Sequence, residues 1–171
     1  REKLGDISPE QLEKILANKV QKINSFSSNE ILTAVTILAV LKHCRALEIT
    51  KILLIEPLCS YNKLIKRFAN KGILIRSIEE LIIKSDFNLA NFSKKFEEYM
   101  PIGINAIFLL SRMNLVKIVG NKIIFNGEFF NFEEKTLGEK AITRIKGSSK
   151  LSNILKTTSC DDMYLHLRVE L

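Results

Sequence analysis

The sequence predicts a mainly α-helical (α+β) fold, and the first evidence for it lies in the middle of the chain. Phe92, Phe96 and Tyr99 recur three to four residues apart, which gives one helix an aromatic face. Pro101 follows Met100, and proline both lacks a backbone donor and restricts the residue before it. We therefore expect this helix to stop near Met100 and a second helix to begin at Pro101.

A hairpin should follow the second helix. Two β-rich runs, 115–119 and 122–125, flank the dipeptide Gly120-Asn121, which is typical of a tight primed turn with positive φ. Helix, turn, helix and hairpin together are the plan of a winged-helix-type unit. We expect that unit over about residues 86–126, with a helical part before it.

The second helix is mostly apolar from Ile102 to Met113. A DNA-recognition helix offers polar groups to base edges and phosphates, whereas here only Asn105, Ser111 and Arg112 are strongly polar. Leaving a large apolar side chain exposed forfeits roughly 1.5 to 3 kcal/mol. We therefore expect a core helix packed under the hairpin. Its expected buried residues are Ile104, Ile107, Phe108, Leu109, Leu110 and Leu115.

Capping-box patterns, in which Ser is followed three residues later by Glu or Gln, predict three more helices. The first begins at Ser8 and should reach about residue 23. The second contains the nearly unbroken apolar run Ile31–Leu41, so we expect it to be the central core helix. The third should cover residues 77–84.

The remaining segments are shorter. The β-branched run 49–55 predicts a strand, and a helix should follow from about residue 60 to 70. Near the C-terminus, 137–146 is expected to be a helix, the sequence Gly147-Ser148-Ser149 should break it, and 150–156 should form another.

The last eight residues alternate between polar and apolar side chains, the period of a strand with one apolar face. A lone strand needs a sheet edge, so this tail should pair with strand 49–55 or with an edge on a partner protein. Its candidate partner-interface residues are Tyr164, Leu165, Leu167 and Val169.

Composition fits a single compact domain spanning residues 1–171, because 46% of the residues are apolar. The net charge of +7 comes from 26 Lys and Arg against 19 Asp and Glu. Such a charge fits either phosphate contacts or a lysine-rich solvated surface. The candidates for non-specific DNA contact recur along one predicted helix and its exit: Lys63, Lys66, Arg67 and Lys71.

Three cysteines without CxxC spacing do not suggest a disulfide framework, so we expect a reducing, cytoplasmic location. No apolar run reaches the ~18 residues of a membrane helix, and no membrane partner is expected. The beginning of the sequence lacks the pattern of a signal peptide.

Catalytic patterns are missing from the sequence. His43 and His166 are the two histidines, and neither lies in an HExxH or HxE motif. The glycines form no phosphate-binding loop, and nothing local activates a cysteine. We therefore expect a protein that is not an enzyme, with no cofactor and no metal.

Four stretches resemble one protein family in their order and spacing. They are NEILTAVTILAVL, ITKILLIEPLCSYNKLIKRF, FSKKFEEYMPIGINAIFLLSRMNLVKIVGNKIIF and LSNILKTTSCDDMYLHLRVEL. The chain is similar to the middle component of bacterial three-component ABC systems, which accompanies a Rad50/SMC-like ABC ATPase and an effector. The resemblance implies an adaptor with winged-helix architecture that joins these two partners in defence against phage or plasmids.

Two main classes of function remain open from the residues, and an enzyme that uses a cysteine or acidic site of no recognised pattern is a third. One is the non-enzymatic adaptor, which could also be a homo-oligomer and bind DNA without sequence preference. The other is a winged-helix DNA-binding protein, either a transcription regulator or a plasmid replication factor. The apolar second helix favours the adaptor, since a regulator needs that helix polar and exposed to water.

Overall fold

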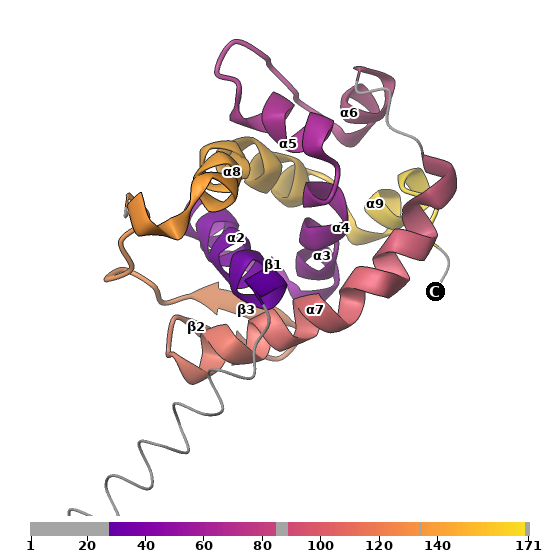
Figure 1. Ribbon diagram of the computed structural model, residues 1–171. Helices are drawn as coiled ribbons and strands as arrows, with labels where there is room; N and C mark the ends of the chain where they lie inside the picture. The colour runs from indigo at the N-terminus through magenta and orange to yellow at the C-terminus, as the bar shows by residue number, and fades with distance from the viewer. Residues whose placement is uncertain (1–27, 85–88, 134, 170–171) are drawn as a thin grey trace, which may run out of the picture.

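Helix α2 (Ser28–Cys44) lies at the centre of the structure, a computed structural model that describes residues 28–84, 89–133 and 135–169. Every residue from Thr33 to Leu41 is buried, and α7 and α8 pack on α2 from two sides (Figure 1). The Thr36 hydroxyl donates to the Leu32 carbonyl at 2.7 Å, so this buried polar side chain has a partner. The prediction of a central core helix is confirmed. The helix predicted from Ser8 lies outside the described residues.

The described elements confirm the predicted fold class, mainly helical with a small antiparallel sheet. After α2 they are β1 (Ala46–Glu48), α3 (Ile49–Leu53), α4 (Ile55–Cys59), α5 (Asn62–Ala69), α6 (Ile78–Lys84), the 3-10 turn η1 (Leu89–Asn91), α7 (Phe92–Arg112), β2 (Val116–Val119), β3 (Lys122–Phe125), the 3-10 turn η2 (Lys135–Leu137), α8 (Glu139–Thr157) and α9 (Cys160–His166).

The predicted hairpin is confirmed. Val119 pairs with Lys122, and Gly120 between them has φ 58°. Because Asn121 does not share the positive φ, the turn matches the primed type with glycine first. The sheet order is β1-β3-β2, with Leu47 opposite Ile123. The first strand therefore comes from outside the predicted 86–126 unit.

The predicted strand 49–55 is wrong. Strand β1 ends at Glu48, and the apolar run after it forms the short helices α3 and α4. Ile52 and Ile55 are fully buried there, and Pro57 sits in the first turn of α4, where its missing N–H leaves no helical bond unmade. A short apolar run does not distinguish a strand from a buried helix. Here the tertiary packing of the run stabilises two short helices.

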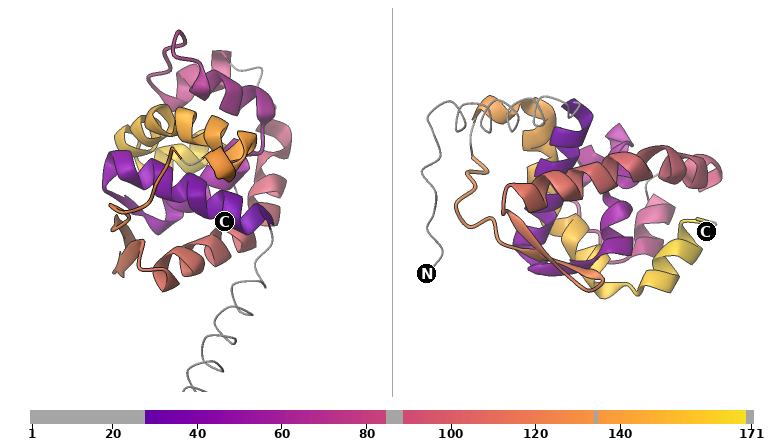
Figure 2. Two further views of the ribbon diagram at one scale, coloured as in Figure 1. Left: turned by 60° about the vertical axis from the view of Figure 1, so that its left-hand side comes forward. Right: turned by 90° about the horizontal axis from the view of Figure 1, so that it is seen from below.

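The predicted stop at Met100 is also wrong, because α7 is one continuous helix (Figure 2, right). Pro101 cannot donate to the carbonyl of Glu97. Both residues lie on the exposed side of the helix, where water can hydrate the freed carbonyl. The helix continues to Arg112, and Asn114, which has φ 56°, closes it two residues later. The Leu115 N–H bonds to the Leu110 carbonyl at 3.0 Å, as in a Schellman cap.

The predicted break at Gly147 does not occur, and α8 continues through it. A Cβ added at Gly147 would lie 2.8 Å from the Cβ of Phe68, so the missing side chain lets α8 approach α5 closely. The buried Ser148 hydroxyl donates to the Ile145 carbonyl at 2.7 Å without leaving the helix. Small residues here serve helix packing.

The tail is helix α9, and the prediction of a strand is wrong. Ser159 caps the helix by accepting a bond from the Asp162 N–H at 3.1 Å. Arg168, at φ 53°, ends it in a second Schellman cap, with Val169 N–H bonded to the Tyr164 carbonyl.

The helix predicted over 77–84 is confirmed as α6, and Ser77 caps it by accepting from the Glu80 N–H at 3.2 Å. Within the described ranges, none of the helices has the length and apolar content that crossing a membrane requires. The buried hydrophobic residues form one cluster that reaches from Ala34 in α2 to Leu167 after α9.

Candidate functional site

The predicted basic candidates lie on and after α5. Lys63, Lys66 and Lys71 are exposed, and Arg67 is half-buried. The opposite side of α5 packs against α8 through the apolar residues Leu64, Ile65 and Phe68. Lys63, Lys66 and Arg67 therefore lie on the side of α5 that faces away from α8, and Lys71 follows the end of the helix.

Helix α8 adds basic residues to this region that the sequence did not assign to it. Lys150 donates to the Asn70 carbonyl at the end of α5. Lys140, in the first turn of α8, lines a pocket together with Lys66. Only the packing of α5 on α8 brings these residues together, and no local sequence pattern reports it.

The predicted partner-interface residues divide between core and surface. Leu167 is fully buried and Tyr164 is nearly so, whereas Leu165 is 74% exposed and Val169 is half-buried. The Tyr164 hydroxyl donates to the Thr50 carbonyl at 2.9 Å. The assignment of Tyr164 and Leu167 to a partner surface is therefore wrong, because both hold α9 on the rest of the fold.

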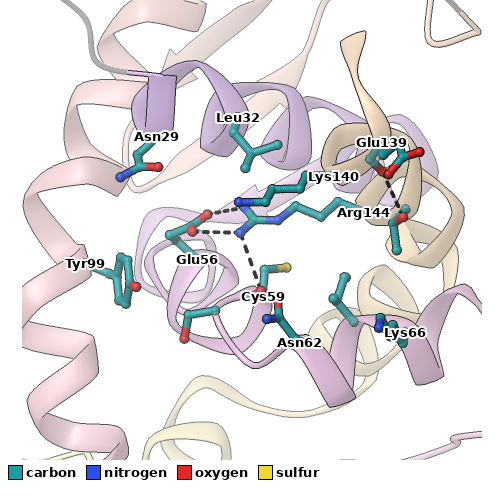
Figure 3. A pocket seen from close by; sticks show the side chains of 13 residues that line it. Asn29, Leu32, Glu56, Cys59, Asn62, Lys66, Tyr99, Glu139, Lys140 and Arg144 are labelled. Atoms are coloured by element: carbon teal, nitrogen blue, oxygen red, sulfur yellow. Dashed lines mark hydrogen bonds and ion pairs between the residues drawn. The ribbon is translucent and has the colours of Figure 1, made fainter. Parts of the chain in front are cut away.

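A pocket of about 420 Å³ lies between α2, α4, α5, α7 and α8. Its lining is mostly polar: Asn29, Leu32, Glu56, Cys59, Ser60, Asn62, Ile65, Lys66, Tyr99, Glu139, Lys140, Thr143 and Arg144. Figure 3 shows the Arg144 guanidinium reaching toward the Glu56 carboxylate, with Tyr99 and Lys66 on opposite sides of the view.

The Glu56–Arg144 contact is a buried, bidentate ion pair. Arg144 Nη1 lies 2.6 Å from Glu56 Oε2, and Nη2 lies 3.0 Å from Oε1. The Thr33 hydroxyl lies 2.8 Å from both Glu56 Oε2 and the Asn29 carbonyl, and its single hydrogen can serve either acceptor. The pair thus connects α2, α4 and α8.

The electrostatics of the pair favour a charged Arg144. Burial lowers the pKa of Arg144, but the hydrogen bond to Glu56 and the nearby Cys59 and Glu56 outweigh it, so the pKa stays above its ordinary value. The arginine therefore offsets the carboxylate in the wall of the pocket, and each charge depends on the other for its partner.

Two cysteines can be judged as nucleophiles. Burial raises the pKa of the Cys59 thiol to about 12, which keeps it protonated and unreactive near neutral pH. Burial also raises the pKa of Cys44. No group of three or more His, Cys, Asp or Glu side chains able to hold a metal ion occurs in the part of the chain that the structure describes.

Some apolar side chains of α7 are exposed where the sequence predicts burial. Phe108, predicted to be core, is 58% exposed, and Ile104 is 39% exposed; the prediction of burial is wrong for both. Ile107, Leu109 and Leu110 are buried as predicted. Because α7 is continuous, Phe108 lies on the opposite side of the helix from Phe92, Phe96 and Leu110.

These exposed residues belong to a larger group. Ten large hydrophobic residues are exposed in the described part of the chain, and five of them fall between residues 104 and 119. They are Ile104, Phe108, Met113, Ile118 and Val119. We call α7, β2 and β3 together the helix–hairpin unit.

Comparisons with protein-family models, with curated proteins and with solved structures find no match for this chain. The resemblance to the middle component of three-component ABC systems therefore stands on its four sequence stretches alone.

Proposed function

We propose that this protein is a non-enzymatic adaptor that binds other proteins through the helix–hairpin unit. The observation that supports this most is the concentration of exposed hydrophobic residues in one short part of the chain. Exposed apolar groups lose contact with water when a protein partner covers them, and such patches are typical of interaction sites.

The composition of the same surface argues against sequence-specific DNA binding. A recognition helix reads bases with arginine, lysine, asparagine or glutamine side chains. The exposed side of α7 between residues 101 and 112 offers only Asn105 and Arg112 of these types. Asn105 Nδ2 already donates to Glu30 Oε1 at 2.5 Å.

The proposal includes a winged-helix architecture, but one that also uses elements outside the predicted 86–126 unit. Helix α2, strand β1, helix α3, helix α7 and the β2–β3 hairpin follow one another in the order of a winged helix, with β1 paired to β3. Helices α4, α5 and α6 would be an insertion before α7. In this arrangement α7 takes the place of the recognition helix and the hairpin that of the wing.

Strand β2 is the part of the unit best suited to a second protein. Within the described residues it pairs with β3 on one side only, so its other edge has free backbone donors and acceptors. Ile118 and Val119 are exposed beside that edge. A partner strand could satisfy the edge and cover both side chains.

The partners we propose come from the sequence resemblance. They are a Rad50/SMC-like ABC ATPase and an effector, acting together in the cytoplasm against phage or plasmids. Co-expression of the tagged chain with an ABC ATPase encoded beside it tests the proposal. The wild-type chain should retain the ATPase on affinity purification, and Ile118→Glu should lose it.

Leu74→Glu is the matched control, since Leu74 is also an exposed aliphatic residue and lies outside the helix–hairpin unit. It should retain the ATPase. Equal retention by wild type and both variants would contradict a role for the hairpin, and no retention by wild type would contradict this partner.

The exposed lysines of α5 favour a second, weaker activity, which is DNA binding without sequence preference. Phosphate-dominated affinity falls steeply as salt rises. Unrelated duplexes should bind with similar affinity at low salt, and Lys63→Glu should weaken all of them alike. A strong preference for one duplex would instead support the regulator or replication factor.

A further inference from the structure

The outer side of α7 carries a stripe of exposed residues. The spacings between its members read the same from either end of the stripe. The outer stripe consists of Glu97, Pro101, Ile104, Asn105, Phe108 and Arg112. Successive members are four, three, one, three and four residues apart, so the stripe has its midpoint between Ile104 and Asn105. Figure 1 shows α7 along the lower edge of the molecule.

A second α7 laid antiparallel on this stripe would pair residues at equal distances from the midpoint. Glu97 would face Arg112 of the other copy, and the twofold axis would repeat that contact. An opposite-charge pair would therefore close each end of the interface. Neither residue has an ion-pair partner within 4.0 Å among the described residues, so each charge is available.

The middle of the same pairing is mostly apolar, with Asn105 of each copy as its polar residue. Pro101 would face Phe108, and Ile104 would face Asn105, with the two Ile104 side chains adjacent across the axis. Asn105, next to Ile104, donates to Glu30 of α2, so this part of the stripe lies beside the N-terminal turn of α2. An aromatic and aliphatic centre between charged ends is the usual plan of a protein interface.

Helix polarity favours this orientation as well. Antiparallel helices place the positive end of one macrodipole beside the negative end of the other. In a parallel pair the twofold axis would instead bring Glu97 to Glu97 and Arg112 to Arg112, and like charges would repel.

We propose that two copies of this chain form a twofold-symmetric dimer through the outer stripe of α7. This inference rests on the proposed function, because it names the partner that covers the α7 side of the helix–hairpin unit. The adaptor would then be a dimer that carries two β2 edges for its other partners.

Sedimentation velocity on the full chain tests the dimer. The wild type should sediment as a dimer at about 100 µM, and Phe108→Asp should weaken dimerisation at least tenfold, since it places a charge in the apolar centre. Circular dichroism should show that the variant remains folded, because Phe108 is exposed. A monomeric wild type, or a dimer unaffected by Phe108→Asp, would overturn the proposal.

The charged ends allow a sharper test. Glu97→Arg and Arg112→Glu should each dimerise more weakly than the wild type, because each leaves two like-charge contacts. A one-to-one mixture of the two variants should recover dimerisation, since one copy then presents two arginines and the other two glutamates. Lys63→Glu, a charge reversal on α5, is the control and should behave like the wild type. Failure of the mixture to recover would overturn the antiparallel pairing.

These results are separable from those that test the adaptor. A monomer that retains the ATPase through Ile118 would overturn the dimer and leave the adaptor standing. A dimer that retains no ATPase would overturn this partner of the adaptor and leave the dimer standing.

Discussion

Arg144 and Glu56 form a buried ion pair across 88 residues of sequence, with N–O distances of 2.6 and 3.0 Å. The pair fixes α8 against α4, and the Thr33 hydroxyl beside it brings in α2. A contact of this kind makes the relative position of three helices depend on two charges.

Removing one member of the pair should destabilise the protein strongly. We expect Arg144→Met to lower the free energy of unfolding by about 3 to 5 kcal/mol, because Glu56 is then a buried charge without a counter-ion. The double variant Arg144→Met, Glu56→Leu should recover much of that loss. Urea denaturation of the three proteins measures both values, and a double variant no more stable than the single one would contradict the explanation.

Phe108 and Leu110 should respond very differently to truncation. Leu110→Ala removes a buried side chain and should cost about 2 to 5 kcal/mol of unfolding free energy. Phe108→Ala removes an exposed one and should cost less than about 1 kcal/mol in the monomer. Urea denaturation at several protein concentrations separates this effect from any contribution of association, and a large loss that does not vary with concentration would show that Phe108 is buried.

Gly147 should not accept a branched side chain. Gly147→Val places new atoms where a Cβ alone would already lie 2.8 Å from Phe68 Cβ and 3.3 Å from the Ala69 nitrogen. Overpacking of this kind costs about 1 to 3 kcal/mol. The matched control is Ser149→Val, because Ser149 is an exposed position on the same helix, and thermal melts of the two variants should differ by several degrees.

Stability should fall at alkaline pH partly because of Tyr164. Burial, and then the nearby Cys160, raises the pKa of Tyr164 from 10.0 to about 12 in the folded protein. Between these values the unfolded chain loses the phenolic proton and the folded protein keeps it, so deprotonation favours unfolding. The stabilisation is complete below pH 10 and disappears as pH rises to about 12.

Tyr164→Phe removes that titration while keeping the ring. Melting temperatures followed from pH 8 to pH 11.5 should therefore fall less steeply in the variant than in the wild type. Parallel curves for the two proteins would show that the Tyr164 pKa is not raised on folding.

Local patterns predicted the elements that depend on a few adjacent residues. The unbroken apolar run predicted α2, the dipeptide Gly120-Asn121 predicted the hairpin, and Ser77 predicted the start of α6. In each case the physical cause lies within the segment itself, as burial on all sides, a positive φ or a capped N–H.

The error at Pro101 explains why the apolar surface was missed. A helix restarted at Pro101 has no fixed phase relative to Phe92 and Phe96, so Phe108 could be assigned to the core. In a continuous helix the phase carries through, and Phe108 falls opposite the buried side. The signal was present in the sequence, and an internal proline on a solvated side hid it.

The ion pair and the tail could not be predicted in this way. Nothing near Glu56 indicates that its partner is Arg144, because the contact depends on how α4 and α8 pack. The alternation in the tail agrees with a strand as well as with a short helix that buries Met163, Tyr164 and Leu167.

The position of α2 between α7 and α8 also determines when the chain can fold during synthesis. Helix α2 is synthesised before α8, which covers one of its sides and ends at Thr157. At ~5–20 residues per second, the intervening chain takes on the order of 5 to 20 s to make. Throughout that interval the mostly apolar run 31–41 of α2 lacks part of its cover in the nascent chain. Productive folding must therefore await α8, and chaperones that bind apolar segments have time to act on α2 first.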